Sequence, residues 1–255
     1  MLRTVPPSPR GRARRGARPR VYQPAPAIDG PGRVPDPARS EMEDPMRRLR
    51  RLVLVRHGET DGESSIRFHG SSDVELSEAG RAQMRQVALR HPEGADLVVA
   101  SPLRRSWRSA LIAGGGRPVR LEADFREIHF GRWEGMTRDE IQARDPVLYA
   151  DWQARAPGFE FPGGEAREAF RERVQRGLER LLDADADDAM VVVHKGVIRI
   201  LVETLTGETI GPDEPAIGYA IVLSRRPDGR WVCGVRSSNP EGVDAPQPVE
   251  LSPEA

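Results

Sequence analysis

The chain of 255 residues has one cysteine, no net charge and no long apolar run. Because Cys233 is alone, no disulfide can form within the chain, which suits the reducing environment of the cytoplasm. No stretch approaches the roughly 20 consecutive apolar residues that a membrane-spanning helix needs. The 39 basic side chains are balanced by 39 acidic ones, which argues against binding of nucleic acid over the whole surface. We therefore expect a cytoplasmic protein with no membrane segment and no nucleic-acid partner.

The two ends of the chain lack the apolar periodicity of folded elements. Residues 1–46 are rich in arginine, proline, glycine and alanine, and such a segment cannot bury enough surface to offset its chain entropy. We predict that it is disordered; its arginines are compatible with an arm for nucleic acid or an acidic surface, but a native start at Met46 or Met42 is the preferred interpretation. Residues 237–255 are polar and proline-rich, which predicts a flexible tail.

Between residues 47 and 236 the pattern alternates between apolar runs typical of strands and amphipathic stretches typical of helices. This alternation predicts one α/β domain with a largely parallel sheet. The expected strands cover residues 52–55, 96–100, 190–193, 220–223 and 231–235. The expected helices start at residues 77, 102, 137, 165 and 197, and the one at 137 breaks or restarts at Asp145-Pro146.

Two of the expected strands end in similar polar sequences, Arg56-His57-Gly58 and His194-Lys195-Gly196. The carboxyl ends of parallel strands meet at one edge of a sheet, which is where ligands bind, so we expect the two histidines to lie together. Arginine matches phosphate oxygens in bidentate fashion, and a helix that starts at Gly196 would offer free N–H groups to an anion. These residues predict a phosphate pocket; strands that simply end in solvated charges are the alternative.

Five segments, in order along residues 52–199, resemble the motifs of the histidine phosphatase superfamily, the phosphoglycerate mutase-like proteins. They are Leu-Val-Arg-His-Gly-Glu-Thr at 54–60, the stretch 67–80, Ser-Pro-Leu-Arg-Arg at 101–105, the stretch 125–135, and His-Lys-Gly-Val-Ile-Arg at 194–199. The resemblance implies a three-layer α/β/α fold with a mostly parallel central sheet, like that of phosphoglycerate mutase.

The same resemblance implies catalytic roles for five residues. His57 would be the nucleophile and become a phosphohistidine, with its other ring nitrogen donating to a backbone carbonyl so that the attacking nitrogen is neutral. Arg56, Arg105 and His194 would hold the phosphoryl oxygens in the transition state. Glu127 would protonate the leaving oxygen and then activate water. No metal or organic cofactor is implied.

Further positions are expected to shape the pocket. Phe130 and Trp133 are expected to wall the Glu127 carboxyl and favour its protonated form. Glu134 is interpreted as a packing or turn residue rather than the acid. The residues expected to contact substrate are Gly58, Thr60, Arg67, His69, Gly70, Lys195 and Gly196.

Three positions depart from the pattern of many relatives. Glu63 replaces an asparagine and would either turn to solvent or contact a cationic part of the substrate. His69 replaces a glutamine. Lys195, the only lysine in the chain, replaces a glycine and would either reach a second anionic group or lie solvated on the rim.

The spacing of the motifs favours a phosphatase over a mutase. The interval from Glu127 to His194 is 194 − 127 = 67 residues, which leaves little room for the long insertion that covers the mutase site. An open site lets water reach the phosphohistidine. We predict a phosphomonoesterase, a monomer or homodimer, that acts on a small phosphorylated metabolite. The alternatives are mutase-type phosphoryl transfer, an α-ribazole phosphate phosphatase specifically, and a phosphate-binding scaffold without turnover.

Overall fold

The computed structural model describes residues 49–61, 66–211 and 214–236. All of them belong to the unit Asp44–Ala255, and only that unit is described. The predictions for residues 1–46 and 237–255, for the start at Met46 or Met42, and for Glu63 lie outside the described residues. Within the three described ranges, no helix is both long enough and apolar enough to cross a membrane.

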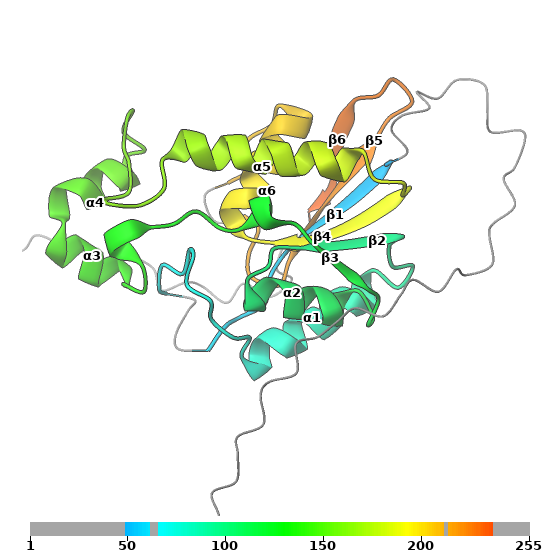
Figure 1. Cartoon of the computed structure of the whole chain (residues 1–255), viewed down its shortest axis with the longest axis horizontal. Helices are drawn as coiled ribbons and strands as arrows, with labels where there is room; N and C mark the ends of the chain where they lie inside the picture. The colour runs from blue at the N-terminus through cyan, green and yellow to red at the C-terminus, as the bar shows by residue number, and fades with distance from the viewer. Residues whose placement is uncertain (1–48, 62–65, 212–213, 237–255) are drawn as a thin grey trace, which may run out of the picture. The chain divides into compact units, whose positions relative to one another are not determined.

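The centre of the fold is a six-stranded sheet with the order β3-β2-β4-β1-β5-β6 (Figure 1). The first four strands in this order run parallel, and β5 and β6 add an antiparallel hairpin at one edge. The predicted, mostly parallel sheet is therefore confirmed. The strands are β1 (Arg51–Arg56), β2 (Leu97–Ala100), β3 (Val119–Leu121), β4 (Asp188–Val193), β5 (Ala220–Arg225) and β6 (Trp231–Arg236).

Helices cover both faces of this sheet, which confirms the three-layer prediction (Figure 1). Strand β1 shows why: Val53 and Val55 pack into the cluster that contains α1 and α2 side chains, whereas Leu52 and Leu54 pack into the cluster that contains those of α5 and α6. Side chains alternate between the faces of a strand, so an apolar run such as this one needs a layer on each side. The four helices are α1 (Glu78–Arg90), α2 (Arg104–Ala113), α5 (Arg167–Leu182) and α6 (Lys195–Thr206).

The segment between β3 and α5 forms two 3-10 turns and two short helices beside an aromatic cluster. The turns are η2 (Ala123–Phe125) and η3 (Gly131–Trp133), and the helices are α3 (Arg138–Arg144) and α4 (Pro146–Gln153). Thr137 and Glu140 form the predicted capping box, and Pro146 restarts the chain as α4, also as predicted. The ring cluster consists of Phe68, Phe130, Trp133, Tyr149, Trp152, Phe159 and Phe161.

Three helix starts differ by two residues from the sequence predictions, and one strand was not predicted. Helix α5 begins at Arg167 and not at Glu165. Helix α2 begins at Arg104 and not at Pro102, because the Ser101 hydroxyl accepts the Leu103 N–H at 3.2 Å and holds these residues in a turn. Helix α6 begins at Lys195, two residues before the predicted start. Strand β3 was not predicted, since it has only three residues, none of them buried, and so short a run shows no periodicity.

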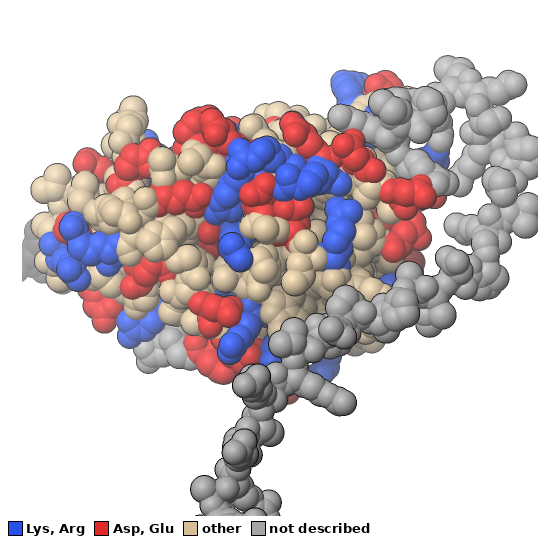
Figure 2. All heavy atoms as spheres, viewed as in Figure 1, with Lys and Arg blue, Asp and Glu red and all other residues tan. Residues whose placement is uncertain are grey.

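The outer face of α5 is solvated and carries charges of both signs. Figure 2 shows basic and acidic side chains intermixed on the face that α5 occupies. Arg171 pairs with Glu203 at 3.1 Å, and Arg180 pairs with Glu122 at 2.7 Å. The exposed Arg171–Glu203 pair contributes little to stability, about 0–1 kcal/mol, whereas Glu122 of the second pair is buried. The helix is held mainly by its buried apolar face.

We predict that Ala166→Ser raises the free energy of unfolding by about 0.5–1 kcal/mol. Ala166 is the N-cap of α5, has an extended backbone (φ −61°, ψ 136°) and provides no side-chain acceptor, although Glu160 already accepts the Arg167 N–H. Urea unfolding would measure the change. The matched control is Ser77→Ala, which removes the cap bond from Gly80 N–H to Ser77 Oγ in α1 and should cost about 1 kcal/mol. If Ser77→Ala loses stability but Ala166→Ser gains none, the N–H groups in the first turn of α5 already have acceptors.

Candidate active site

The two histidines meet at the carboxyl ends of adjacent parallel strands. In the register of β1 with β4, Arg56 lies opposite Val193, so His57 and His194 each follow directly. The His57 N–H donates to the Val193 carbonyl at 3.0 Å, which extends the ladder by one bond. The ring centroids lie 5.2 Å apart in an edge-to-face arrangement. The predicted juxtaposition of the histidines is confirmed.

The turn after β1 requires glycine because another backbone crosses it. A Cβ on Gly58 would lie 2.5 Å from the carbonyl oxygen of Gly80 at the start of α1, and a Cβ on Gly80 would lie 2.1 Å from the carbonyl oxygen of Glu59. The Gly58 N–H donates to Ser109 Oγ at 3.1 Å. This close approach fixes the backbone that carries the His57 ring, and it gives Gly58 a packing role where a substrate contact was expected.

His57 is held as a neutral base. Its Nδ1 lies 2.8 Å from the Gly58 carbonyl oxygen and donates to it, as predicted, which leaves the lone pair on Nε2. Burial, followed by the charges of Arg105 and Arg56, holds the pKa of His57 well below its ordinary value of 6.5, against the smaller opposing effect of the Gly58 bond. At neutral pH the ring therefore carries an unprotonated nitrogen that is able to act as a nucleophile.

His194 is fully buried and has one bonded ring nitrogen. Its Nε2 lies 2.9 Å from Ser101 Oγ, and the same hydroxyl accepts the Leu103 N–H. We assign the hydroxyl proton to the bond with Nε2, so the ring proton sits on Nδ1, which has no partner within the described part of the chain. Burial and the charge of Arg105 hold the pKa of His194 well below 6.5. His194 thus offers a neutral N–H donor.

Arg105 enters the site from α2 and is 1% exposed, whereas Arg104 lies on the surface beside Asp73. The Arg105 Nη1 donates to the Ser72 carbonyl at 2.6 Å, and its Nη2 donates to the carbonyls of His69 and Gly70 at 2.9 and 2.6 Å. Its buried Nε has no partner among the described residues. Burial lowers the pKa of Arg105 to about 10, so the group remains a cation at neutral pH.

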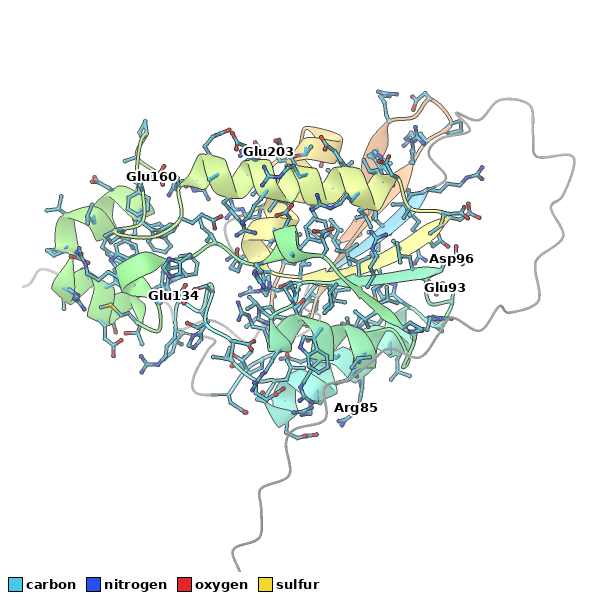
Figure 3. All side chains as sticks on the ribbon, viewed as in Figure 1. Arg85, Glu93, Asp96, Glu134, Glu160 and Glu203 are labelled. Carbon is cyan, nitrogen blue, oxygen red and sulfur yellow. The ribbon has the colours of Figure 1, made fainter. Side chains whose placement is uncertain are left out.

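The loop at residues 69–72 is clamped from both sides of its backbone. Arg105 binds its carbonyls, and the Glu134 carboxylate accepts the N–H groups of Gly70, Ser71 and Ser72 at 3.2, 2.9 and 3.3 Å. Figure 3 labels Glu134, which comes from the end of η3. The interpretation of Glu134 as a packing or turn residue is confirmed. The clamp holds the buried ring of His69, whose pKa burial lowers, close enough to His57 to affect its pKa.

Glu127 joins the segment after η2 to the start of α6. Its Oε1 accepts the Ile128 N–H at 3.0 Å, and its Oε2 accepts the Gly196 N–H at 3.1 Å. A Cβ on Gly196 would lie 2.4 Å from Oε1 and 3.2 Å from the Phe170 ring, so a side chain here would displace the Glu127 carboxylate. The Gly196 N–H was expected to serve the phosphate; it serves the carboxylate instead.

The role of Phe130 and Trp133 as walls of the Glu127 carboxyl stays a prediction. Their rings pack into the aromatic cluster, where the indole of the fully buried Trp133 donates to Asp145 at 2.9 Å. The ring beside the contact of Glu127 with Gly196 is that of Phe170, from α5. Phe170 was not predicted at the site, because a phenylalanine on an amphipathic helix is typical of a core position.

The remaining predicted residues lie in different surroundings. Arg56 donates from Nη1 to the Pro215 carbonyl at 3.1 Å. Arg67 donates to the Gly135 carbonyl at 2.8 Å and pairs with Glu140 at 3.1 Å, so its guanidinium is directed to the start of α3.

Thr60 is buried and forms an isolated antiparallel β-bridge with Leu76. Lys195 is half-buried as the first residue of α6. Among the described residues, no group of three or more His, Cys, Asp and Glu side chains could hold a metal ion.

Comparison with known proteins decides the family. Residues 52–216 match the model of the histidine phosphatase superfamily, branch 1. The chain belongs to this superfamily. It is 35% identical over 186 residues to the glucosyl-3-phosphoglycerate phosphatase of Mycobacterium tuberculosis, with 67% of this chain and 81% of that protein covered. It is 34% identical over 165 residues to the adenosylcobalamin/alpha-ribazole phosphatase of Salmonella typhimurium, with 61% and 79% covered.

A solved structure of this superfamily has a similar fold. The mycobacterial glucosyl-3-phosphoglycerate phosphatase in complex with VO3 matches with a TM-score of 0.64 and 31% identity, over 75% of this chain and 100% of that one. The comparisons confirm the predicted family and the class of histidine phosphatase, a phosphomonoesterase.

The low pKa values of the two site histidines make the stability of the fold depend on pH. The unfolded chain takes up protons below about pH 6.5, whereas the folded chain keeps these rings neutral, so the free energy of unfolding falls as the pH drops below 6.5. We predict that His194→Asn reduces the difference in the free energy of unfolding between pH 7.5 and pH 5.5 by about 1 kcal/mol, measured by urea unfolding. His129→Asn, at an exposed position, is the control and should leave the difference unchanged. An unaltered pH dependence in His194→Asn would contradict the neutral, buried state of this ring.

Proposed function

We propose that this protein hydrolyses a small phosphomonoester in two steps through a phosphohistidine on His57. The observation that carries the proposal is the bond from His57 Nδ1 to the Gly58 carbonyl, because it leaves a neutral Nε2 beside the half-buried Arg56, the buried Arg105 and His194. A half-buried, uncharged imidazole among arginines suits attack on a phosphate dianion. In this proposal residues 47–236 form the histidine phosphatase domain.

In the first step the His57 Nε2 attacks phosphorus and the bond to the leaving oxygen breaks. Arg56, the unpartnered Nε of Arg105 and the Nδ1–H of His194 donate to the phosphoryl oxygens and offset their charge. The protonated Glu127 carboxyl gives its proton to the leaving oxygen, so an alcohol departs and a carboxylate remains.

In the second step the Glu127 carboxylate takes a proton from water, and the resulting hydroxide attacks phosphorus. The bond between phosphorus and His57 Nε2 breaks, inorganic phosphate leaves, and both groups return to their starting states. The bonds from the Ile128 and Gly196 N–H groups keep the carboxylate in one place during both transfers.

Hydrolysis is favoured over mutase-type transfer by the size of the segment between Glu127 and His194. Helices α3, α4 and α5 together with β4 occupy most of these residues, which leaves little chain to cover the site. The named activities of the two relatives, on glucosyl-3-phosphoglycerate and on alpha-ribazole phosphate, make phosphate esters of sugar-like or nucleoside-like alcohols the first substrates to test. We infer that the protein works in the cytoplasm, since its single cysteine suits a reducing compartment. We also propose that it is a monomer or homodimer.

A screen of phosphorylated metabolites with the wild type and His57→Ala tests the proposal. The panel would include glucosyl-3-phosphoglycerate, α-ribazole 5′-phosphate and p-nitrophenyl phosphate, with released phosphate as the readout. We expect His57→Ala to lower kcat by at least about 10³-fold and the exposed control His129→Ala to leave it within about twofold. Equal release by wild type and His57→Ala would refute the nucleophile, and an absolute requirement for bisphosphoglycerate would favour a mutase.

A further inference from the structure

One arginine of α5 binds the backbone that carries Glu127. The Arg173 side chain is only 14% exposed. Its Nη1 donates to the carbonyls of Asp124 at 2.7 Å and Arg126 at 2.6 Å, and its Nη2 donates to the carbonyl of Glu127 at 3.0 Å. A guanidinium that binds three carbonyls of one short segment fixes the path of that backbone, not merely the position of one side chain.

Glu165 completes the attachment of this segment. Its carboxylate forms a bidentate pair with Arg173, at 2.7 Å to Nε and 2.8 Å to Nη2, so all five N–H groups of the guanidinium have acceptors. Glu165 also forms a backbone bridge to His129, because its N–H donates to the His129 carbonyl at 2.9 Å. The pair therefore holds both ends of the segment 124–129, with Glu127 in the middle.

The pair lies in a shielded environment next to the site. The Phe170 ring stacks on the Arg173 guanidinium with a separation of 4.6 Å, and the same ring packs against Gly196, whose N–H binds the Glu127 carboxylate. Shielding from water strengthens hydrogen bonds to a charged group. Arg173 holds the backbone carbonyl of Glu127, and the Gly196 N–H holds its carboxylate, so the residue is fixed both at its backbone and at the end of its side chain.

We propose that the Arg173–Glu165 pair is a positioning device that sets the Glu127 carboxyl for proton transfer to the leaving oxygen. The inference rests on the proposed role of Glu127 as acid and base. Proton transfer requires hydrogen-bond distance, and a shift of about 1 Å costs about 10²-fold in rate. Neither member of the pair has a described hydrogen bond to His57, His194 or Arg105, and the charge of Arg173 is the smallest of the effects that lower the pKa of His194, so we expect the pair to act mainly through Glu127.

The leaving group distinguishes positioning of the acid from a purely structural role. An alkyl phosphate needs a proton on its leaving oxygen, whereas p-nitrophenolate leaves without one. In single-turnover measurements of phosphohistidine formation, we expect Arg173→Lys and Glu165→Gln to slow the reaction of an alkyl phosphate by about 10–100-fold. They should slow that of p-nitrophenyl phosphate by less than about threefold. Measuring this step alone excludes the later role of Glu127 as a base.

A matched control lies on the same helix. Arg171 of α5 pairs with Glu203 of α6 at 3.1 Å, and Figure 3 labels Glu203. Arg171→Lys should leave both rates unchanged. Glu127→Gln is the reference variant and should show the largest difference between the two substrates.

The outcomes separate the proposal from the function on which it rests. If Glu127→Gln shows the leaving-group effect while Arg173→Lys and Glu165→Gln slow both substrates equally or neither, positioning by the pair is refuted and the function stands. If Glu127→Gln shows no such effect, the acid role fails and the positioning inference fails with it. Should Arg173→Lys not fold, Glu165→Gln, which retains the three carbonyl bonds of Arg173, decides the question alone.

Discussion

The parallel pairing of β1 with β4 is the interaction on which the rest of the structure depends. It brings His57 and His194 from positions 137 residues apart (194 − 57) to ring centroids 5.2 Å apart, and the His57 N–H closes the ladder on Val193. The side chains of β1 alternate between two buried clusters, so a slip of one residue would exchange the two faces and move both histidines out of register. The core therefore fixes the geometry of the site.

The same burial sets the electrostatics of the site. Two histidines are kept neutral by burial and by the arginines beside them, while the carboxylates of Glu127, Glu134 and Asp73 oppose the effect of burial on the pKa of Arg105, which stays charged. Several buried atoms, among them His194 Nδ1 and Arg105 Nε, have no acceptor or donor within the described ranges. Unpaired buried polar atoms are costly, and their concentration at one end of the sheet is what a site built around an oxyanion requires.

Much of this arrangement could be predicted from local sequence. Apolar runs that end in Arg56-His57 and in His194 identified β1 and β4, and the capping box at Thr137 identified α3. Contacts between distant segments left no local signal. The bond between Glu127 and Gly196 depends on how the segment after η2 folds over α6, and no local pattern shows that residues 124–127 cover Arg173 of α5.

The most direct test of the account is to find where the phosphoryl group is carried during turnover. After rapid quenching in alkali, which preserves phosphohistidine, peptide mapping by mass spectrometry should place an acid-labile phosphoryl group on His57. We expect the adduct to be absent from His57→Ala and to persist longer in Glu127→Gln with an aryl phosphate, because the base for the second step is removed. A phosphoryl group on any other residue, or continued turnover without a covalent intermediate, would contradict the central claim.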